Sequence, residues 1–559
     1  MSVPWLARLQ ADRRIISAAS ALRQGRAAAL SAAAPRIADS RYGHEIDALL
    51  ATIARGRIES DAGLALAAGR RALLRDAVAE GLGWLVRAQS AVGPGARVLA
   101  ARIAFYLGGS YVTRAELAPA DAVLAWAEGL LGRAAAGSAD LLHLRALLAE
   151  ARGERDKSLA LYRRTIVRSP NALTPLTRVL ALRNLGEALS HSEPHESVAL
   201  YGLALAIVEA DQLDDNVRST VDNTMGYALI CIGDLQGGRL KLEQALREAN
   251  AHARKRTELY AAFNLAIAAE LEGSADAARL SLEGVRDDAI AVSMRELALW
   301  AEIRLAWLDV KAGRTAEART RLRSVFPAAI PLAYREATGV LHALLGLRAS
   351  PAAARGELTG LARTHAARGD DLGAFAITLW GARADAAAGR IASARRGAAA
   401  ACALGSQRGF RLASNWWSAE LVATAREHAP PEFADYAESL VAPPSTDVAE
   451  PPPAVTLMRD GTIVVGGARL GTEVWRGGRT GRRVLERFFV ALVAAYPAAI
   501  ARDALADLLW PESEGDKAIR NLYGATNDLR RILASVPGVS LAVVDQRYAL
   551  RLEEQVRLS

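Results

Sequence analysis

The sequence is poor in cysteine, which limits the folds and sites that it can form. Only two cysteines, Cys231 and Cys402, occur among 559 residues, and both stand in apolar stretches that read as helices. A disulfide scaffold needs a denser set of cysteines, and a cysteine-based zinc site needs them closely spaced. We therefore expect buried core thiols in a reducing, cytoplasmic compartment.

Lysine is also scarce, although the chain is basic. Lysine and arginine together number 69 and the formal net charge is +8, yet nearly all of these basic residues are arginines. The arginines are spread along the whole chain and form no single basic block. The charge is therefore compatible with nucleic-acid binding without locating a site.

Long apolar runs and catalytic motifs are missing as well. The longest apolar candidate, residues 326–347, is interrupted by Arg335 and Glu336, so no membrane span is predicted. The sequence has no glycine-rich loop followed by Lys-Ser/Thr, which a nucleotide-binding P-loop requires. The N-terminus lacks the basic-then-apolar order of a signal peptide. These absences predict a non-enzymatic protein that binds no cofactor and no membrane.

One histidine-rich stretch, HSEPHE at residues 191–196, contains potential metal ligands. Pro194 interrupts any helix that would align His191 with His195, and the stretch falls between two expected helices. The pattern therefore favours a solvated loop over a metal site.

A regular repeat runs through the middle of the chain. In GERDKSLALYRRTIVRSP, residues 153–170, glycine, small, bulky and proline residues stand at the spacing of a tetratricopeptide repeat. A glycine followed five residues later by a small residue occurs at Gly153/Ser158, Gly233/Gly238, Gly273/Ala278, Gly313/Ala318 and Gly389/Ala394. A variant without the glycine places a small residue at Ser197, and the small positions 158, 197, 238, 278 and 318 are then 39 to 41 residues apart. This regularity predicts stacked helix pairs, clearest over 138–326 and degenerate toward the N-terminus.

A proline-rich stretch follows the repeats. Proline pairs occur at 430–431 and 443–444, and three prolines occupy 451–453. Proline density of this kind favours an extended, semi-stiff linker over residues 429–453, although EFADYAESL within it is compatible with a short final helix. The expected domains are a repeat domain at 1–428 and a C-terminal domain at 454–559.

The C-terminal domain shows an ordered series of element signals. Short β-type runs alternate with the turn pairs Asp460-Gly461 and Gly466-Gly467 over residues 455–475, which predicts a small antiparallel sheet. Helices are then expected over 481–497, 501–510 and 516–533, followed by two strands within 539–552. This order predicts a winged helix-turn-helix whose third helix reads DNA. The whole chain is thus expected to be mainly α: a tetratricopeptide-like α-solenoid followed by a small α+β winged helix-turn-helix domain.

The expected third helix has two distinct faces. The predicted apolar face consists of Leu522, Ala525, Thr526, Leu529 and Leu533. The opposite face carries Arg520, Gly524, Asn527 and Arg531, flanked by Lys517, Tyr523 and Arg530. Arginine can read guanine, asparagine can read adenine, and glycine permits close approach to the bases. A basic face is also common on helices that face only solvent. The order of the neighbouring elements favours DNA binding over this alternative.

These residues resemble a known family. The stretch ALADLLWPES…AIRNLYGATNDLRRIL, together with a later RYAL, resembles the OmpR-type winged helix of bacterial response regulators and of the SARP/BTAD group of antibiotic-pathway activators. The positions that match the family pattern are Leu505, Trp510, Pro511, Arg520, Asn521, Leu522, Leu529, Arg530, Arg531, Leu533 and residues 547–550. Ala501 stands where a Ser or Thr helix cap is usual, and Thr526 where a larger apolar residue is usual. SARP activators carry the winged helix first, so the domain order here is reversed.

The pattern and the resemblance together assign roles to individual residues. We expect Arg520, Asn527 and Arg531 to contact bases, with Lys517 and Tyr523 at the edge of that face. Arg530 and the hairpin residue Arg547 are expected to contact phosphates or the minor groove, and Arg482 and Arg483 are candidate phosphate contacts. The resemblance implies that the acidic loop Glu512–Asp516 touches RNA polymerase.

The predicted function is a DNA-binding transcriptional regulator. The repeats would sense or bind a protein or small-molecule partner, and dimerisation would extend the small site of one winged helix. The alternative is a non-enzymatic scaffold or adaptor in which the winged helix mediates protein contacts. A scaffold does not require arginine and asparagine on the exposed face of the third helix.

Overall fold

The computed structural model describes most of the chain. The described residues are 31, 33–36, 38–41, 43–172, 174–325, 332–347, 349–443, 455–458, 462–465, 468–469, 475, 480–513, 515–533, 536, 538–552 and 556–558. The chain divides into two compact units, Met1–Pro444 and Ser445–Ser559.

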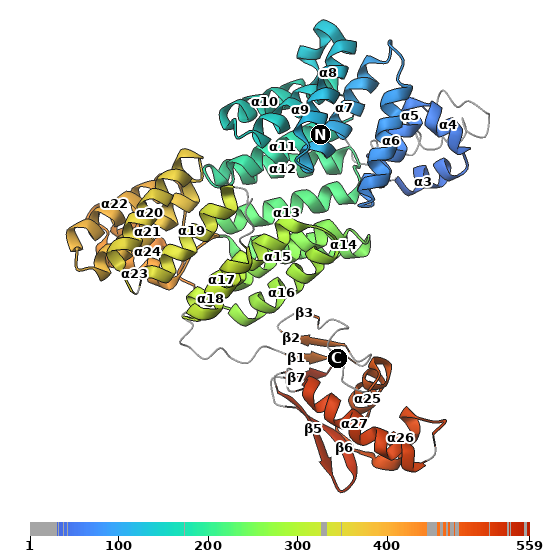
Figure 1. Ribbon diagram of the computed structural model, residues 1–559, viewed down its shortest axis with the longest axis vertical. Helices are drawn as coiled ribbons and strands as arrows, with labels where there is room; N and C mark the ends of the chain where they lie inside the picture. The colour runs from blue at the N-terminus through green and yellow to red at the C-terminus, as the bar shows by residue number, and fades with distance from the viewer. Residues whose placement is uncertain are drawn as a thin grey trace. The chain divides into compact units, whose positions relative to one another are not determined.

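The first unit is built from helix pairs stacked one after another (Figure 1). Two short helices, α3 (Gly43–Ala51) and α4 (Arg55–Ser60), precede the pairs. The pairs are α5 (Ala62–Leu74) with α6 (Val78–Ala91), α7 (Arg97–Thr113) with α8 (Leu117–Leu131), α9 (Ala139–Ala151) with α10 (Arg155–Arg168), α11 (Leu176–Leu189) with α12 (Pro194–Ala210), α13 (Asp215–Cys231) with α14 (Leu235–Ala251), α15 (Lys255–Leu271) with α16 (Ala275–Ala291), α17 (Arg295–Lys311) with α18 (Thr315–Val325), α19 (Leu332–Leu347) with α20 (Pro351–Ala367), and α21 (Asp371–Ala387) with α22 (Ile391–Arg408). The pairs therefore extend on both sides of the region where the repeat is clearest in the sequence.

The repeat glycines end the first helix of their pairs, as the spacing predicts. Gly153, Gly233, Gly273, Gly313 and Gly389 all have a positive φ, between 70° and 94°. This conformation is easily adopted only by glycine and allows the chain to reverse within three residues. The prediction of a tetratricopeptide-like repeat is confirmed at these turns.

The small residue five positions later lies where the two helices of a pair cross. Ser158, Ser197, Ala278, Ala318 and Ala394 are at most 2% exposed. A Cβ atom added to Gly238 of α14 would lie 2.8 Å from the carbonyl oxygen of Gly226 on α13, because the two backbones touch there. Larger residues at these positions would push the paired helices apart.

The two helices of a pair differ in burial. The first helix of each pair is called the A helix below, and the second the B helix. On the B helix α14, the buried residues Gly238, Leu242, Ala245 and Ala249 form one stripe at helical spacing. The A helix α13 buries nine residues, among them the polar Asp222 and Asn223. The A helices therefore form an inner layer and the B helices an outer one.

The turn between α11 and α12 differs from its prediction. His191 lies in this turn, and its Nδ1 atom is 3.0 Å from Asp370 Oδ1, while its Nε2 atom is 2.9 Å from the Tyr227 hydroxyl. The Leu372 amide also donates to the His191 carbonyl, at 2.9 Å. The expected solvated loop is therefore wrong, because the turn between α20 and α21 packs over it. The described residues contain no group of three or more His, Cys, Asp or Glu that could hold a metal ion.

The expected linker is folded in its first half. Helix α23 (Ala419–His428) is followed by a short 3-10 helix, η3 (Pro431–Phe433), and by α24 (Ala434–Ser439). The Tyr436 hydroxyl donates to the Phe410 carbonyl at 2.5 Å, and the Trp417 indole nitrogen donates to the Val441 carbonyl at 2.8 Å. Residues 429–443 thus pack onto the repeats, in contrast to the predicted extended chain from 429. The rest of the predicted linker lies outside the described residues.

Both cysteines are free and buried in the first unit. Burial raises the pKa of the Cys402 thiol to about 11, which keeps it protonated at neutral pH. None of the described helices combines the length and the apolar composition needed to cross a membrane.

The described residues of the second unit form two small sheets and three α-helices. One sheet has the order β3-β2-β1-β7, formed by β1 (Val455–Leu457), β2 (Ile463–Val465), β3 (Ala468–Arg469) and β7 (Val556–Leu558), with β1 and β7 parallel. Then come α25 (Arg482–Ala495), β4 (Ile500–Ala501), α26 (Arg502–Leu509) and α27 (Gly515–Leu533). Strands β5 (Val539–Val544) and β6 (Arg547–Leu552) form a hairpin, and the second sheet has the order β4-β6-β5. The turn pairs Asp460-Gly461 and Gly466-Gly467 lie outside the described residues.

Candidate functional site

Helix α27 is held in the second unit by its apolar face. Ala518, Leu522, Ala525 and Leu529 are 0% exposed, and Leu533 is 2% exposed. They pack against Phe488 and Leu492 of α25, Leu505 of α26, and Val539 and Leu541 of β5. This face is the one that the 3.6-residue period of the sequence predicts.

Thr526 also belongs to the buried face, although it is polar. Its side chain is nearly buried, and its hydroxyl donates to the Leu522 carbonyl at 2.6 Å. That bond satisfies the hydroxyl within the helix, so the residue needs no other partner in the core.

The opposite face of α27 carries the predicted contact residues. Lys517, Arg520, Tyr523, Asn527, Arg530 and Arg531 are all exposed. Arg531 Nη1 lies 3.3 Å from Asp528 Oδ1, and Asp528 also accepts from the Thr480 amide at 3.3 Å. Gly524 lies on the same exposed face, and a Cβ atom added to it would meet no atom within 4 Å. A ligand could therefore approach the helix backbone closely at Gly524.

The β5–β6 hairpin presents further basic residues. Its turn residues, Asp545 and Gln546, have φ angles of 48° and 61°, the left-handed pair that a two-residue hairpin turn requires. Arg547 is exposed just after the turn, and Arg551 is exposed on the same side of β6. Arg551 was not among the predicted residues, although the alternation of β6 places residues 547, 549 and 551 on one face.

The hairpin is tied to the start of α26. Ala501 of β4 pairs with Arg547 of β6, and the Arg502 amide donates to the Gln546 carbonyl at 2.8 Å. Ala501 occupies the N-cap position of α26 without a side-chain hydrogen bond to the helix. The absent cap noted in the sequence is therefore a real feature of this helix start.

The two arginines at the start of α25 form a separate basic pair. Arg482 and Arg483 are both exposed, and Arg482 Nε donates to Glu486 Oε1 at 2.8 Å. The structure thus gathers six predicted residues on α27, places Arg547 on the hairpin, and places Arg482 and Arg483 on α25.

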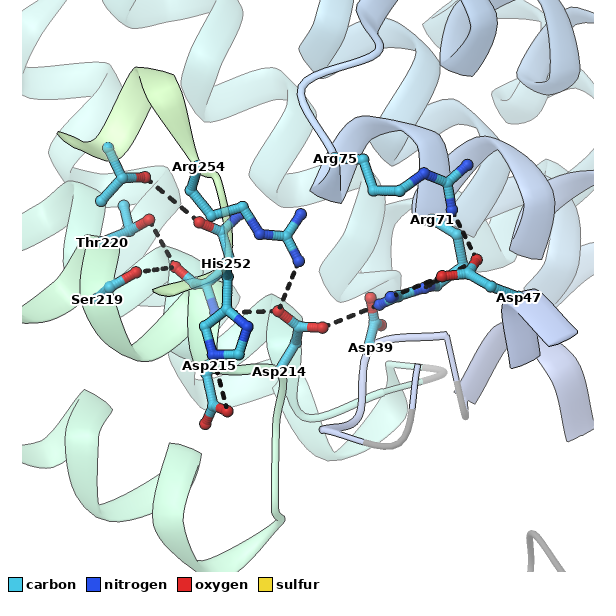
Figure 2. Close-up of polar contacts among 12 residues, drawn as sticks. Asp39, Asp47, Arg71, Arg75, Asp214, Asp215, Ser219, Thr220, His252 and Arg254 are labelled. Atoms are coloured by element: carbon cyan, nitrogen blue, oxygen red, sulfur yellow. Dashed lines mark hydrogen bonds and ion pairs between the residues drawn. The ribbon is translucent and has the colours of Figure 1, made fainter. Parts of the chain in front are cut away.

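The first unit contains a dense polar network around Asp214, the N-cap of α13 (Figure 2). Arg71 is 1% exposed, and its Nη1 atom donates to Asp214 Oδ2 at 2.9 Å while its Nη2 atom donates to Asp47 Oδ2 at 3.0 Å. Arg254 Nη2 lies 4.0 Å from Asp214 Oδ1, and burial lowers the pKa of Arg254. The network joins α3, α5, the start of α13 and the turn before α15.

A second buried cluster surrounds Asp39, which is 0% exposed. Asp39 accepts from the Tyr106 hydroxyl at 2.5 Å, from Arg70 Nε at 2.8 Å and from Arg102 Nη2 at 3.3 Å. Arg102 Nη1 also donates to Asp140 and Thr177. Burial raises the pKa of Tyr106, so the phenol stays protonated and donates.

A third cluster lies in the later repeats around Arg304, which is 1% exposed. Arg304 pairs with Glu270, and its Nη1 atom donates to the Ser414 carbonyl at 2.8 Å and to Asn415 Oδ1 at 3.0 Å. The Trp307 indole also donates to Glu270, at 2.6 Å. Two non-helical segments of the chain, around Asp39 and around Ser414, are thus anchored on A helices.

No protein-family model matches the chain, and no curated protein matches it in sequence. Several solved structures share part of its helical arrangement. A Rap protein in complex with competence and sporulation factor is 12% identical, with a TM-score of 0.49 over 63% of this chain and 99% of that one. Aspartyl phosphate phosphatase F from Bacillus subtilis is 10% identical, with a TM-score of 0.36 over 70% and 95%.

A signal transduction ATPase with numerous domains and a tetratricopeptide repeat sensor, from Pyrococcus horikoshii, is 13% identical, with a TM-score of 0.33 over 51% and 43% of the two chains. At these identities and TM-scores the likeness carries no function to this chain. The helices themselves establish the architecture: the first unit is a tetratricopeptide-like helical repeat array, and an α+β unit follows it.

Proposed function

We propose that the protein is a DNA-binding transcription regulator whose second unit is a winged helix-turn-helix. The single observation that carries the proposal is the exposed face of α27, with Lys517, Arg520, Asn527 and Arg531 along one side of a helix seated by its other side. Arginine and asparagine are the residues that read guanine and adenine in the major groove. The open space at Gly524 favours close approach of the helix to the bases.

The surrounding elements support a winged-helix assignment for this unit. A small sheet is followed by α25, α26 and α27 and then by the β5–β6 hairpin, the order of a winged helix-turn-helix. In this proposal Arg530 and the hairpin residues Arg547 and Arg551 hold phosphates or the minor groove. Arg482 and Arg483 at the start of α25 contact the backbone and contribute no sequence information.

The remaining parts receive roles that follow from this assignment. We propose that the repeats bind a partner or join two copies of the chain, since one winged helix covers a short site. The regulator would act in the cytoplasm, without a catalytic step or a cofactor. The acidic segment Glu512–Asp516 was expected to be a loop, but its last two residues begin α27. In this proposal the segment would contact RNA polymerase.

The full chain tests DNA reading directly. The protein is used to select sequences from a random double-stranded DNA pool, and the selected sites are titrated by fluorescence anisotropy at two salt concentrations. Arg520→Ala/Arg531→Ala is compared with Arg395→Ala/Arg396→Ala, which removes two exposed arginines from α22 in the first unit. We expect a recurring site that the first variant loses and the control retains.

Other outcomes contradict the proposal in distinct ways. Binding that is salt-sensitive but selects no sequence would reduce the second unit to a non-specific basic module. No binding at all would favour the adaptor function. For the loop, Glu512→Lys should abolish transcription activation in a reconstituted assay and leave DNA affinity unchanged. A loss of DNA affinity in that variant would exclude a polymerase-contact role.

A further inference from the structure

A pocket of about 430 Å³ lies beside the third helix pair of the array. It is lined by residues of α8, α9 and α10, and α9 packs against both of the other helices (Figure 1). Its volume falls within the range of small-molecule sites, about 300–1,000 Å³. Four of its nine lining residues are cationic and none is acidic; the cations are Arg145, Arg152, Lys157 and Arg164. The lining therefore favours an anionic ligand.

The cations have the same spacing on both helices of the pair. On each helix two apolar residues stand between two cations, at positions i, i+3, i+4 and i+7. They are Arg145, Leu148, Ala149 and Arg152 on α9 and its C-cap, and Lys157, Ala160, Leu161 and Arg164 on α10. Seven residues are two helical turns, so each set lies along one face of its helix. The pocket is thus bounded by two cationic faces.

The pairing of α9 with α10 places these cations at two ends of the pocket. The two helices run in opposite directions, because a turn of three residues joins them. Arg152 and Lys157 are therefore near the turn, and Arg145 and Arg164 are at the other end. A rise of 1.5 Å per residue separates the two ends by about 10 Å along the helices. A ligand that meets both ends has to be elongated.

The middle of the pocket is apolar. Leu148, Ala149 and Leu161 are at most 8% exposed, and Leu124 of α8 is a partly buried residue of the same core. These side chains offer a hydrocarbon or aromatic body a surface that removes it from water. An inorganic ion would leave this surface uncovered, so the lining favours an organic anion.

The cations keep hydrogen-bond donors available. Arg164 is exposed and has no ion pair among the described residues. The other three cations have surface partners that are 37–45% exposed, in the pairs Arg145–Glu128, Arg152–Asp121 and Lys157–Glu154. Ion pairs at this exposure contribute little to stability, and an arginine has five N–H donors and a lysine three. A ligand can therefore bind donors that these pairs leave unused.

The repeat fold does not require these four cations. Arg145 and Arg152 stand eight and one residues before the turn glycine Gly153, and Lys157 and Arg164 stand four and eleven residues after it. No lysine or arginine occurs at any of these four positions in the repeats of Gly233, Gly273, Gly313 and Gly389. The cations belong to this repeat alone among the five, so helix pairing does not account for them.

We propose that this pocket binds an elongated organic dianion, which has an apolar body and an acidic group at each end. Arg152 and Lys157 hold one acidic group, and Arg145 and Arg164 hold the other. The apolar body covers Leu148 and Leu161. The inference deepens the partner-binding role proposed above for the repeats and is independent of DNA reading by the second unit.

The test compares probes that share an apolar body and differ in charge. The full chain is titrated by calorimetry with azelate, nonanoate and nonanediol, which carry two, one and no carboxylates. We expect azelate to bind most tightly, nonanoate about tenfold more weakly, and the diol more weakly still, because each charge-assisted contact adds affinity. Hexanediol bisphosphate is titrated in parallel, and the tighter of the two dianions identifies the acidic group as carboxylate or phosphate.

Three variants locate the binding. Lys157→Gln/Arg164→Gln removes one exposed cation from each end and should lower dianion affinity about tenfold or more. Arg239→Gln/Arg247→Gln is the matched control, since it removes two exposed arginines from the B helix α14. Ala160→Trp keeps every charge and fills the middle of the pocket from an exposed position, so it should block binding. Circular dichroism checks that each variant is folded.

The proposal is overturned if neither dianion binds more tightly than the diol. It is also overturned if the control loses as much affinity as Lys157→Gln/Arg164→Gln, or if folded Ala160→Trp binds the dianions like wild type. The DNA selection described above is repeated with Lys157→Gln/Arg164→Gln. Retained DNA reading with lost dianion binding supports this inference, whereas absent DNA reading in the wild type would refute the regulator function alone.

Discussion

The close crossing of α13 and α14 makes a sharp prediction for Gly238. A Cβ atom there would lie 2.8 Å from the Gly226 carbonyl oxygen and 2.9 Å from Ile230 Cγ1. The nearer of these atoms is backbone, so relief requires the two helices to separate. Overpacking of this kind costs about 1–3 kcal/mol, against which alanine gains about 0.5–1 kcal/mol over glycine in a helix. We expect Gly238→Ala to destabilise the first unit by about 1–2 kcal/mol.

Gly284 provides the matched control on the next B helix, α16. It is exposed, and a Cβ atom added to it would meet nothing within 4 Å. Gly284→Ala should therefore stabilise the protein by about 0.5–1 kcal/mol through helix propensity alone. The glycine-to-alanine substitution is thus expected to lower the free energy of unfolding at Gly238 and to raise it at Gly284, on two neighbouring repeats.

Urea unfolding followed by circular dichroism measures the change in the free energy of unfolding of the whole protein. Native-state hydrogen exchange shows which helices are destabilised. Repeat arrays can depart from two-state behaviour, so the local exchange of α13 and α14 is the stricter readout. Gly238→Ala should accelerate it by roughly tenfold, the factor that 1.4 kcal/mol represents. The reasoning is refuted if Gly238→Ala is as stable as Gly284→Ala, because the two helices would then not touch at their backbones.

Three further predictions concern the helix cap, the DNA contacts and the histidine turn. Ala501→Ser should raise the stability of the second unit by about 1 kcal/mol in thermal unfolding, since it supplies the missing cap of α26. Arg530→Ala and Arg547→Ala should each lower the salt dependence of DNA binding by about one unit of slope and leave the selected sequence unchanged. Although burial opposes it, Tyr227 and Asp370 raise the pKa of His191 well above its ordinary value of 6.5. The stabilisation by protonated His191 is therefore complete below about pH 6.5 and is lost as the pH rises through the raised pKa. The urea concentration at the unfolding midpoint should fall at alkaline pH in the wild type, and His191→Gln should reduce this fall.

The repeats were predictable because their determinants are local. A turn glycine such as Gly233 and a crossing residue such as Gly238 are five positions apart and act within one helix pair. The buried face of α27 followed likewise from the helical period, and Leu522 and Leu529 lie where that period places them. In each case, residues at a fixed interval in the sequence take equivalent positions in the helices.

The contacts that sequence reasoning missed join distant residues. Asp39 and Arg102 are 63 positions apart, and Tyr227 and Ser414 are 187 apart. Nothing in the local pattern of either partner identifies the other, and the histidine turn looked solvated because its cover comes from Asp370. Strand β7 was missed for the same reason, since it is completed only by pairing with β1 at the far end of the domain.

These long-range contacts change how the array should respond to force or ligand. In an ordinary repeat array each repeat contacts only its neighbours, so its stability is a sum of local terms. Here the turn before α12 is bonded to Asp370 and Leu372, and α13 is bonded to Ser414, several repeats later. Opening the later repeats must therefore break the contacts that His191 makes in the α11–α12 turn and that Tyr227 makes on α13.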